Sequence, residues 1–405
     1  MRPVRVAHVT TIDLTLRAML LPQLLRLREA GFEVVGVSAP GDSVRELEAQ
    51  GIRHVPWPHV TRAWDPRADL RAFVELLAIL RRERFDVVHT HNPKPGVMGR
   101  LAGRLVGVPC VVHTTHGLYA TPDDPPSRKV PVLSLEWLAS RFSDLELYQS
   151  QEDLAWARRI GLVDRSKGVL LGNGVDLARF DPAALSKERL ERLRQELGIP
   201  SHATVVGTVG RLVVEKGYRE LFAAARRVCE DDPDVWFLVV GPNDPVKSDA
   251  LGDDEMKAVG DRVVFTGWRD DVRDLLGLMD VFVLASWREG VPRSAIEAAA
   301  MERALVLTDI RGCREVIRHQ VEGILVPVRD GAGLAAAITS LVGDDPLRGR
   351  LGGAARARAL ERFDEHRVTE SVLAHYRRVL AAKGYAGGPP QQGGERWVTS
   401  HRTNP

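Results

Sequence analysis

Two short segments of the sequence place cations, glycines and carboxylates in a pattern that suits a diphosphate ligand. The first, Gly210-Arg211 with Lys216-Gly217, follows a strand-like stretch and precedes an amphipathic helix. Glycines let the backbone approach a ligand closely, and the two cations can neutralise a diphosphate. The alternative is a strand-to-helix turn with two surface cations. The segment lacks the Gly-Lys-Ser/Thr of a P-loop ATPase.

The second segment runs from Trp287 to Met301 and carries two glutamates, Glu289 and Glu297. Pro292 suits the first turn of a helix, which puts Glu289 in a loop and Glu297 on the helix. At a rise of about 1.5 Å per residue, we expect the carboxylates on the order of 10 Å apart. A retaining glycosidase needs a pair about 5 Å apart, so the spacing disfavours that dyad but leaves an inverting one open. It also fits two groups that grip the ends of an elongated ligand. Surface solvation is the alternative for each glutamate alone.

The rest of the sequence predicts the scaffold that positions these segments. Short apolar stretches such as Val4–Val9 and Asp86–His89 alternate with helical segments such as Leu16–Ala30, and the alternation restarts at Thr204–Val209. Apolar strands separated by amphipathic helices are typical of parallel sheets covered on both faces. We therefore expect an α/β fold with two doubly wound, Rossmann-like domains facing a central cleft, with ligands beyond the carboxyl ends of the strands.

The change of composition along the chain predicts the domain boundaries. We expect an N-terminal domain at residues 1–185 and a C-terminal domain at 200–365, joined by a polar connector. A helix at 366–382 is expected to return toward the N-terminal domain. Residues 383–405 are rich in Gly, Pro and Gln and are expected to be disordered, because they cannot bury enough apolar surface to order themselves.

Composition and charge are those of an ordinary globular protein and argue against nucleic-acid binding. Of 405 residues, 44% are hydrophobic and 27% charged, and the net charge is +2, so there is no global electrostatic case for nucleic-acid binding. Residues 1–180 carry 24 Lys and Arg against 20 Asp and Glu. That small excess suits an anionic acceptor or a membrane surface, although a solvated surface is the favoured interpretation.

The cysteines and the apolar segments predict the compartment. Cys110, Cys229 and Cys313 are far apart and odd in number, which favours a reducing environment. No signal-peptide pattern is present, and no apolar run approaches the ~20 residues of a spanning helix. We expect a cytoplasmic protein whose contact with the inner face of the membrane, if any, is peripheral.

Further short motifs occur in an order that resembles a known family. Asn173-Gly174-Val175-Asp176 precedes the connector, Phe265-Thr266-Gly267-Trp268 ends a later strand, and Thr308–Glu315 follows the two-glutamate segment. Together with the first two segments, this order resembles the retaining GT-B glycosyltransferases of family four. The similarity covers about residues 3–382 and is greatest to bacterial capsule and exopolysaccharide enzymes.

The resemblance implies a donor site in the C-terminal domain and an acceptor side in the N-terminal domain. Arg211 and Lys216 would bind the donor diphosphate and stabilise the charge that develops as it leaves. Glu289 would contact hydroxyls of the transferred sugar, and His116 would lie near the reacting centre. The implied donor-binding residues are Gly210, Trp268, Arg269, Gly290, Val291, Pro292, Arg293, Ser294 and Glu297, with Glu297 on the ribose and Trp268 and Arg269 near the base.

The segment after the first strand departs from the family pattern. Many members carry a glycine-rich loop there, whereas this chain has Thr10–Arg17 without a glycine. Acceptor contacts are instead expected from Thr10, Thr11, Arg17, Asn92 and Lys94. Helix capping by Asp13 or Thr15 is the alternative for this segment. Further on, Pro131–Phe142 has an apolar face and basic flanks; a core helix is favoured there over membrane contact.

Four histidines, His89, His91, His113 and His116, follow or end predicted strands and raise the alternative of a metal site. No carboxylate or cysteine joins them at ligand spacing, so we expect no metal and no cofactor. The expected activity is transfer of a hexose or N-acetylhexosamine from a nucleoside-diphosphate sugar, with UDP as the expected nucleotide. The expected acceptor is a glycan or a polyprenyl-diphosphate-linked sugar in bacterial envelope or exopolysaccharide synthesis.

Two other functions remain open from the sequence. One is a GT-B-like nucleotide-sugar epimerase, and the other is an inactive subunit that binds a nucleotide sugar. A nicotinamide dehydrogenase is disfavoured, because no Gly-x-Gly-x-x-Gly follows the first strand.

Overall fold

The computed structural model of the chain describes residues 2–243 and 249–385, so most of the predicted disordered tail lies outside the described residues. The described chain divides into two compact units. The first holds the chain up to Val112, residues 142–144 and the chain from Leu373 on, and the second holds residues 113–141 and 145–372. The divisions after residues 112 and 372 fall inside a strand and a helix, and those after residues 141 and 144 lie in the short connection between a helix and the next strand. The domain boundaries at 185, 200 and 365 therefore stay predictions.

Seven parallel strands form the first sheet, in the order β3-β2-β1-β4-β5-β6-β7. Central strands β1 and β4 are the apolar runs that the sequence predicts, and they pair in parallel register with His8 opposite His89. The strands are β1 (Arg5–Ile12), β2 (Glu33–Ala39), β3 (Arg53–Pro56), β4 (Val87–His91), β5 (Cys110–Thr115), β6 (Leu145–Tyr148) and β7 (Gly168–Leu170).

The predicted helix Leu16–Ala30 is wrong in its first part. A short helical turn (α1, Asp13–Thr15) leads into a π-helix, η1 (Leu16–Leu20), and the regular helix α2 begins only at Leu21. Pro22 explains the break, because it has no N–H to donate to the carbonyl four residues earlier. The other helices around this sheet are α3 (Val44–Ala49), α4 (Pro66–Glu83), α5 (Pro93–Leu105), α6 (Pro126–Ser140) and α7 (Gln151–Arg159), and α2 itself ends at Glu29.

Six parallel strands form the second sheet, in the order β10-β9-β8-β11-β12-β13. Successive residues of β8 face opposite sides, so that Val205 and Val206 join two different apolar cores. The strands are β8 (Thr204–Val209), β9 (Val235–Val240), β10 (Val263–Gly267), β11 (Val281–Leu284), β12 (Ala304–Thr308) and β13 (Ile324–Val326).

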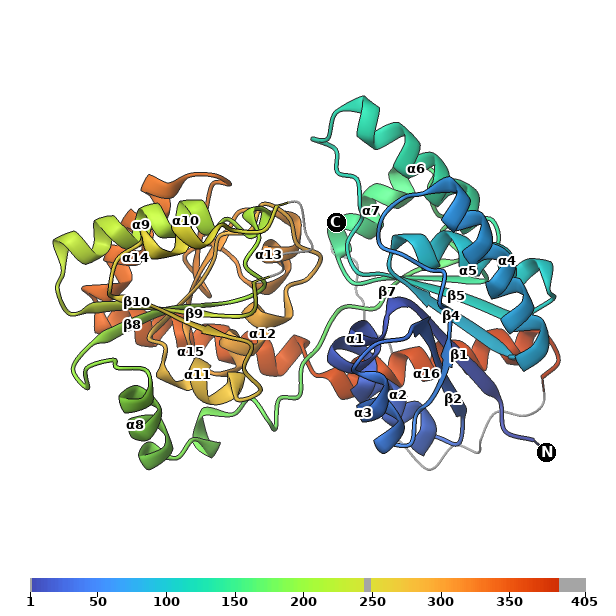
Figure 1. Cartoon of the computed structure of the whole chain (residues 1–405), viewed down its shortest axis with the longest axis horizontal. Helices are drawn as coiled ribbons and strands as arrows, with labels where there is room; N and C mark the ends of the chain where they lie inside the picture. Colours follow the sequence, from blue (N-terminus) through green and yellow to red (C-terminus); the bar gives the residue numbers. More distant parts are fainter. Residues whose placement is uncertain (1, 244–248, 386–405) are drawn as a thin grey trace, which may run out of the picture. The chain divides into compact units, whose positions relative to one another are not determined.

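Helices cover both faces of the second sheet (Figure 1). On one face α9 packs against α14, and on the other α12 packs against α15. Two short 3-10 helices, η2 (Pro182–Ala184) and η3 (Val214–Lys216), lie in the connections. The α-helices are α8 (Lys187–Glu196), α9 (Tyr218–Asp231), α10 (Asp253–Lys257), α11 (Val272–Leu278), α12 (Arg293–Ala300), α13 (Arg311–Val316), α14 (Gly331–Val342) and α15 (Asp345–Arg362).

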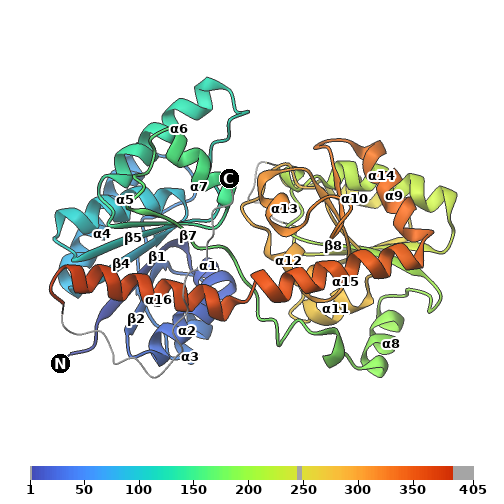
Figure 2. The same cartoon turned by 180° about the vertical axis from the view of Figure 1, so that it is seen from behind.

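The last helix, α16 (Glu365–Ala382), belongs to the first unit from Leu373 onward. Figure 2 shows this part of α16 running along the first sheet. Tyr376 is fully buried there, and its ring packs against those of Phe32 and His89. The end of the chain thus contributes to the core formed by its beginning.

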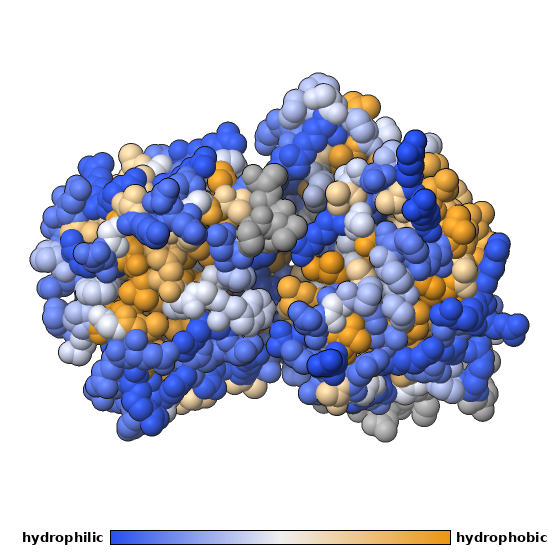
Figure 3. Space-filling model, viewed as in Figure 1, coloured by the Kyte–Doolittle hydropathy of each residue, from blue (hydrophilic) through white to orange (hydrophobic). Residues whose placement is uncertain are grey.

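The face seen in Figure 3 shows many hydrophilic residues, with separate hydrophobic patches between them. Within residues 2–243 and 249–385, no helix combines the length and the hydropathy that a bilayer-spanning segment needs.

Candidate functional site

A cavity of roughly 1160 Å³ lies in the second unit, where loops follow the carboxyl ends of five parallel strands. This is the edge at which α/β sheets bind ligands. The loop after β5 contributes residues between His116 and Pro125, the start of α6 contributes Arg128, and the loop after β8 contributes residues between Arg211 and Lys216. The remaining lining comes from Asp249, from Trp287–Gly290 after β11, from Asp309, Ile310, Arg311 and Arg314 after β12, and from Val328 and Arg329 after β13.

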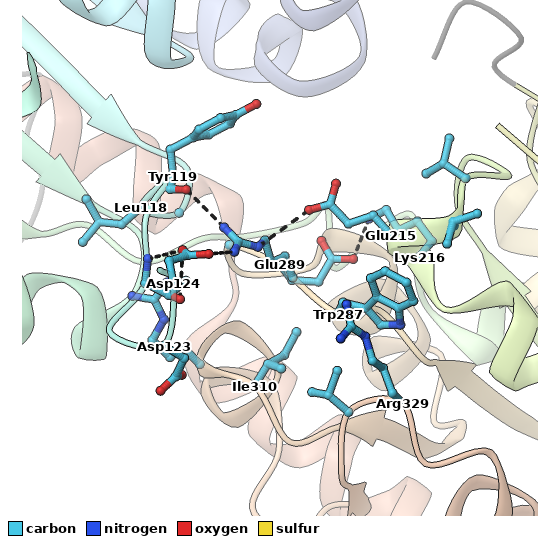
Figure 4. A pocket seen from close by; sticks show the side chains of 18 of the residues that line it. Leu118, Tyr119, Asp123, Asp124, Glu215, Lys216, Trp287, Glu289, Ile310 and Arg329 are labelled. Atoms are coloured by element: carbon cyan, nitrogen blue, oxygen red, sulfur yellow. Dashed lines mark hydrogen bonds and ion pairs between the residues drawn. The ribbon is translucent and has the colours of Figure 1, made fainter. Parts of the chain in front are cut away.

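All four residues predicted as catalytic, namely His116, Arg211, Lys216 and Glu289, line this cavity. Lys216 ends the short helix η3, and the following Gly217 has a left-handed φ of 72° that turns the chain into α9. The Lys216 ammonium lies 2.5 Å from Oε1 of Glu289 (Figure 4). The Ser286 hydroxyl donates to the same oxygen at 2.7 Å. The cation and the carboxylate thus fix each other at the cavity wall.

The backbone around Gly290 is packed against two other loops. A Cβ at Gly290 would overlap the carbonyl of His116, and a Cβ at Gly312 would overlap the carbonyl of Gly290. Gly117, whose φ is 116°, faces the Cα of Gly290. Because only glycine allows these approaches, the loops after β5, β11 and β12 meet at the cavity with their main chains in contact.

His116 is held as a neutral side chain. Burial lowers the pKa of its imidazole to about 4, although a hydrogen bond with the Gln149 side chain acts in the opposite direction. A neutral imidazole can both donate and accept a hydrogen bond. At neutral pH His116 can therefore bind a hydroxyl group in the cavity, but it brings no positive charge.

The other predicted donor residues lie beside the cavity without lining it. Helix α12 begins at Arg293 with Pro292 as its N-cap, as the sequence predicts, and Glu297 lies on it. Burial raises the pKa of Glu297. The carbonyl of Val291 accepts a 2.8 Å hydrogen bond from the Asn173 side chain, which anchors the loop before α12. Ser294 lies in the first turn of α12, and Arg293 itself lies 3.6 Å from Glu365.

The residues predicted to meet the nucleotide base also lie outside the cavity lining. Arg269 makes two hydrogen bonds to Asp271, at 2.8 and 2.7 Å, and one to Glu196 at 2.6 Å, and these carboxylates raise the pKa of its guanidinium. Trp268 is 51% exposed. Gly210 follows β8, and its carbonyl accepts a 2.8 Å hydrogen bond from Tyr218. The roles of Trp268 and Arg269 at the base, and of Gly210 in donor binding, stay predictions.

Comparison with known proteins places this chain in a family. Residues 23–179 match the family described as "Glycosyltransferase Family 4", and residues 203–344 match that described as "Glycosyl transferases group 1". The UDP-Gal:alpha-D-GlcNAc-diphosphoundecaprenol alpha-1,3-galactosyltransferase of Escherichia coli is 28% identical over 351 residues, which are 85% of this chain and 89% of that protein. The D-inositol 3-phosphate glycosyltransferase of Salinispora arenicola is 31% identical over 319 residues, 74% of this chain and 70% of that protein.

This chain is a family 4 glycosyltransferase. Among solved structures, sucrose-phosphate synthase from Thermosynechococcus elongatus matches with a TM-score of 0.78 at 22% identity, over 94% of this chain and 100% of that one. Two parallel-sheet α/β parts and this likeness confirm the predicted GT-B fold class.

Residues predicted on the acceptor side of the glycosyltransferase lie in the first unit. Thr10 and Thr11 are buried, and the Thr10 hydroxyl donates to the carbonyl of Ile12 at 2.9 Å. Arg17, in the π-helix, forms an ion pair with Glu46. The Lys94 ammonium is buried 2.5 Å from Asp69, so this ion pair competes with any ligand for it. Their part in acceptor binding stays a prediction.

Asn92 and Asp13 occupy special positions in the same unit. Asn92 has a left-handed φ of 66° at the start of α5, a conformation that is uncommon outside glycine and often found at functional sites. Asp13 accepts hydrogen bonds from the backbone N–H of Leu14 at 2.9 Å and of Ser43 at 2.8 Å. It ties the segment after β1 to the loop after β2, which differs from the simple helix capping considered as the alternative.

Two of the four histidines considered as a metal site lie together with a third that the sequence analysis did not single out. His89 and His91 of β4 and His8 of β1 are fully buried, with ligand-capable nitrogens within 4.8 Å of one another. Nδ1 of His8 lies 3.0 Å from Nε2 of His91, and Nδ1 of His89 lies 2.5 Å from the Tyr376 hydroxyl. These contacts fit a hydrogen-bonded network of rings. The expected absence of a metal stays a prediction.

Sequence reasoning missed several residues of the cavity. Arg288 donates to the carbonyl of Tyr119 at 3.1 Å and forms an ion pair with Asp124. Across the cavity, the guanidinium of Arg329 lies 4.1 Å from the centre of the Trp287 ring. Figure 4 shows Tyr119 and Asp124 on one side and Trp287 and Arg329 on the other. Trp287 and Arg288 directly precede the predicted Glu289, which was the available signal; the loop holding Asp124 carries no chemical motif.

Proposed function

We propose that this glycosyltransferase transfers a hexosyl or N-acetylhexosaminyl group from a UDP-sugar to a glycan or a polyprenyl-diphosphate-linked sugar in bacterial envelope synthesis, with retention at the anomeric carbon. The observation that carries the proposal is the convergence of His116, Arg211, Lys216 and Glu289 on one cavity. The Escherichia coli relative, whose name specifies UDP-Gal and a diphosphoundecaprenol-linked sugar, supports the classes of donor and acceptor.

Arg211 and Lys216 bind the donor diphosphate in this proposal. A glycosyl transition state resembles an oxocarbenium ion that departs from a diphosphate, so the main requirement is stabilisation of the leaving negative charge. Two cations fixed on the loop after β8 meet that requirement without a metal ion or another cofactor. The N–H groups at the start of α12 add partial positive charge beside them.

Glu289 and His116 orient the transferred sugar. Within the described residues, both polar contacts of the Glu289 carboxylate reach Oε1, from Lys216 and from Ser286. Oε2 then accepts from sugar hydroxyls. The neutral imidazole of His116 supplies a hydrogen bond from the loop after β5. Retention follows from attack on the same face as the leaving diphosphate, as the family resemblance implies.

The direct test is a transfer assay with a panel of UDP-sugars and a polyprenyl-diphosphate-linked sugar, with NMR assignment of the anomeric configuration of the product. Arg211→Ala and Lys216→Ala should each lower kcat by roughly 10²–10³, in analogy with the loss of one oxyanion donor. Arg227→Ala, which removes an exposed cation on α9, is the matched control and should keep full activity.

Four results would contradict the proposal in different ways. Full activity of Arg211→Ala and Lys216→Ala would show that the site is elsewhere. An inverted product would overturn retention. Epimerised donor formed in the absence of acceptor would favour the epimerase. Activity that EDTA abolishes and a divalent metal restores would overturn the metal-free mechanism.

A lipid-linked acceptor also requires the enzyme to reach a membrane. We therefore include peripheral contact with the inner face of the membrane in the proposed function, made by part of the chain before residue 185.

A further inference from the structure

Helix α6 (Pro126–Ser140) is the least covered long helix of the second unit. Only Ala139 and Ser140 of its fifteen residues are buried, so the expectation of a core helix is wrong. Leu133 contacts the small apolar cluster around Tyr148, and this contact keeps the helix on the unit. The exposed fractions of its large apolar residues are 59% for Val130, 40% for Leu135, 47% for Trp137 and 45% for Leu138.

These apolar residues share one face of the helix. At 3.6 residues per turn, positions 130, 131, 134, 135, 137, 138 and 141 fall within one half of the helix circumference. That face carries apolar side chains, Ser134 and, at its end, Arg141, and it has no acidic residue. Glu136 lies on the opposite face and is half-buried. Figure 3 shows hydrophobic residues at the surface in the region of α6, bordered by hydrophilic ones.

Cations flank the apolar face at both ends. Arg141 follows the helix, and its guanidinium lies 4.6 Å from the centre of the Trp137 ring. At the start of the helix, Arg128 lies 5.8 Å from the centre of the exposed Tyr119 ring and 3.9 Å from Asp124, whose carboxylate also pairs with Arg288. The Lys129 ammonium donates to the carbonyl of Pro122. Apolar residues with tryptophan between basic ends are the composition of helices that lie in the interface of an anionic membrane.

We propose that α6 docks this glycosyltransferase on an anionic phospholipid surface, with Val130, Leu135, Trp137 and Leu138 entering the interface. The cations at both ends of the helix would attract negatively charged headgroups. They would repel the same cations of a second copy of α6, so we favour a membrane over a second copy as the partner. The surface is continuous with the cavity, because Tyr119 and Arg128 line the cavity at the start of α6. The inference rests on the proposed function, since a lipid-linked acceptor is what makes membrane contact useful.

The test compares two leucines of nearly equal exposure. Leu138 of α6 is 45% exposed, and Leu360 of α15 is 43% exposed. The full chain, Leu138→Glu, Leu360→Glu and the double variant Trp137→Glu/Leu138→Glu are mixed with vesicles of phosphatidylcholine and phosphatidylglycerol and separated by flotation. The double variant should bind at least about 30-fold more weakly, because two large apolar side chains no longer enter the interface. Leu360→Glu should bind like the unchanged chain.

Activity with two acceptors separates this inference from the proposed function. With an acceptor embedded in vesicles the double variant should be slower by a similar factor, and with a water-soluble short-chain acceptor it should match the unchanged chain. Vesicle binding that survives in the double variant, or an equal loss in Leu360→Glu, overturns the role of α6. A shift from dimer to monomer in Leu138→Glu shows that the face binds a second copy instead. Vesicle binding without transfer to either acceptor leaves α6 as a membrane surface and overturns the proposed function.

Discussion

Gly290 lines the cavity at a position where the neighbouring backbone leaves no space for a side chain. Its backbone is packed between the carbonyl of His116 and Gly312 at the start of α13. A methyl group at position 290 would collide with main-chain atoms, which must then move. A flexible neighbouring side chain could have rotated out of the way, but the neighbours here are main chain. Since His116 and Glu289 both flank this contact in space, their positions in the cavity depend on it.

Gly290→Ala should therefore lower kcat/KM by roughly 10²-fold, because a displacement of about 1 Å in the positioning loops is enough for such a loss. Overpacking of this kind should also cost about 1–3 kcal/mol of the free energy of unfolding. Steady-state kinetics and a urea unfolding curve of the same preparation measure both effects.

Gly349 provides the control for this substitution. It lies inside α15, and a Cβ added there would meet no atom within 4 Å. Gly349→Ala should leave kinetics unchanged and add about 0.5–1 kcal/mol of stability, since alanine loses less backbone entropy in a helix. Unchanged kinetics in Gly290→Ala would show that the close approach does not position the site.

At the scale of single residues, the sequence predicted the charged residues of the site better than it predicted contacts between residues distant in the chain. Arg211, Lys216 and Glu289 stand next to glycines or at the start of a helix, where their types already indicate a diphosphate ligand. In contrast, Arg288 and Asp124 are 164 positions apart in the chain, and nothing local links them. Their pairing depends on how the loops fold together.

At the scale of elements, the loop after β5 is fastened to the loop after β11. Arg288 of the second loop binds the carbonyl of Tyr119 and the carboxylate of Asp124 in the first. Burial alone would raise the pKa of Asp124, but hydrogen bonds from Arg288 and Thr121 outweigh it and hold the pKa below its ordinary value. The carboxylate therefore stays charged near neutral pH, and the ion pair between Asp124 and Arg288 should not depend on pH in that range.

Asp124→Asn should loosen residues 117–125 and raise KM for the donor several-fold while kcat changes little, because the loop forms a wall of the cavity but supplies no leaving-group charge. Hydrogen exchange of the loop amides and donor titration measure the two effects. Asp123→Asn is the matched control: Asp123 also lines the cavity, and within the described residues it forms no ion pair. Equal behaviour of the two variants would show that the Arg288 contact does not hold the loop.

Elements were predictable where one pattern dominated. Strands β1, β4, β8 and β11 are apolar runs, and the start of α12 follows from Pro292. The prediction failed where tertiary packing decided: α6 has enough apolar residues for a core helix, but it turns most of them outward. The π-helix after β1 was also missed, because the helical periodicity of residues 16–30 continues across Pro22.

At the scale of the whole molecule, buried histidines set how its stability responds to acid. His8 of β1 is fully buried, and burial lowers the pKa of its imidazole to about 3. The groups that face it are His89 and His91 of β4, with the Tyr376 hydroxyl of α16 behind His89. Each of these rings packs against another ring, and none of these facing groups is a carboxylate that could compensate a charge on His8.

The sign of the pH dependence follows from the two end states. An unfolded histidine takes up a proton near pH 6.5, whereas folded His8 stays neutral until about pH 3. Between these values the unfolded state binds more protons, so the free energy of unfolding falls as the pH falls. His8 alone should remove about 2 kcal/mol of the free energy of unfolding between pH 7 and pH 5.

His8→Gln should lose less stability over this pH range, whatever the stability of the variant at pH 7. Tyr376→Phe disturbs the same cluster without removing a histidine, so it should lower stability by equal amounts at both pH values. Urea midpoints at pH 7, 6 and 5 distinguish these outcomes, and a His8→Gln chain that loses as much stability in acid as the unchanged chain would show that the proton is taken up elsewhere.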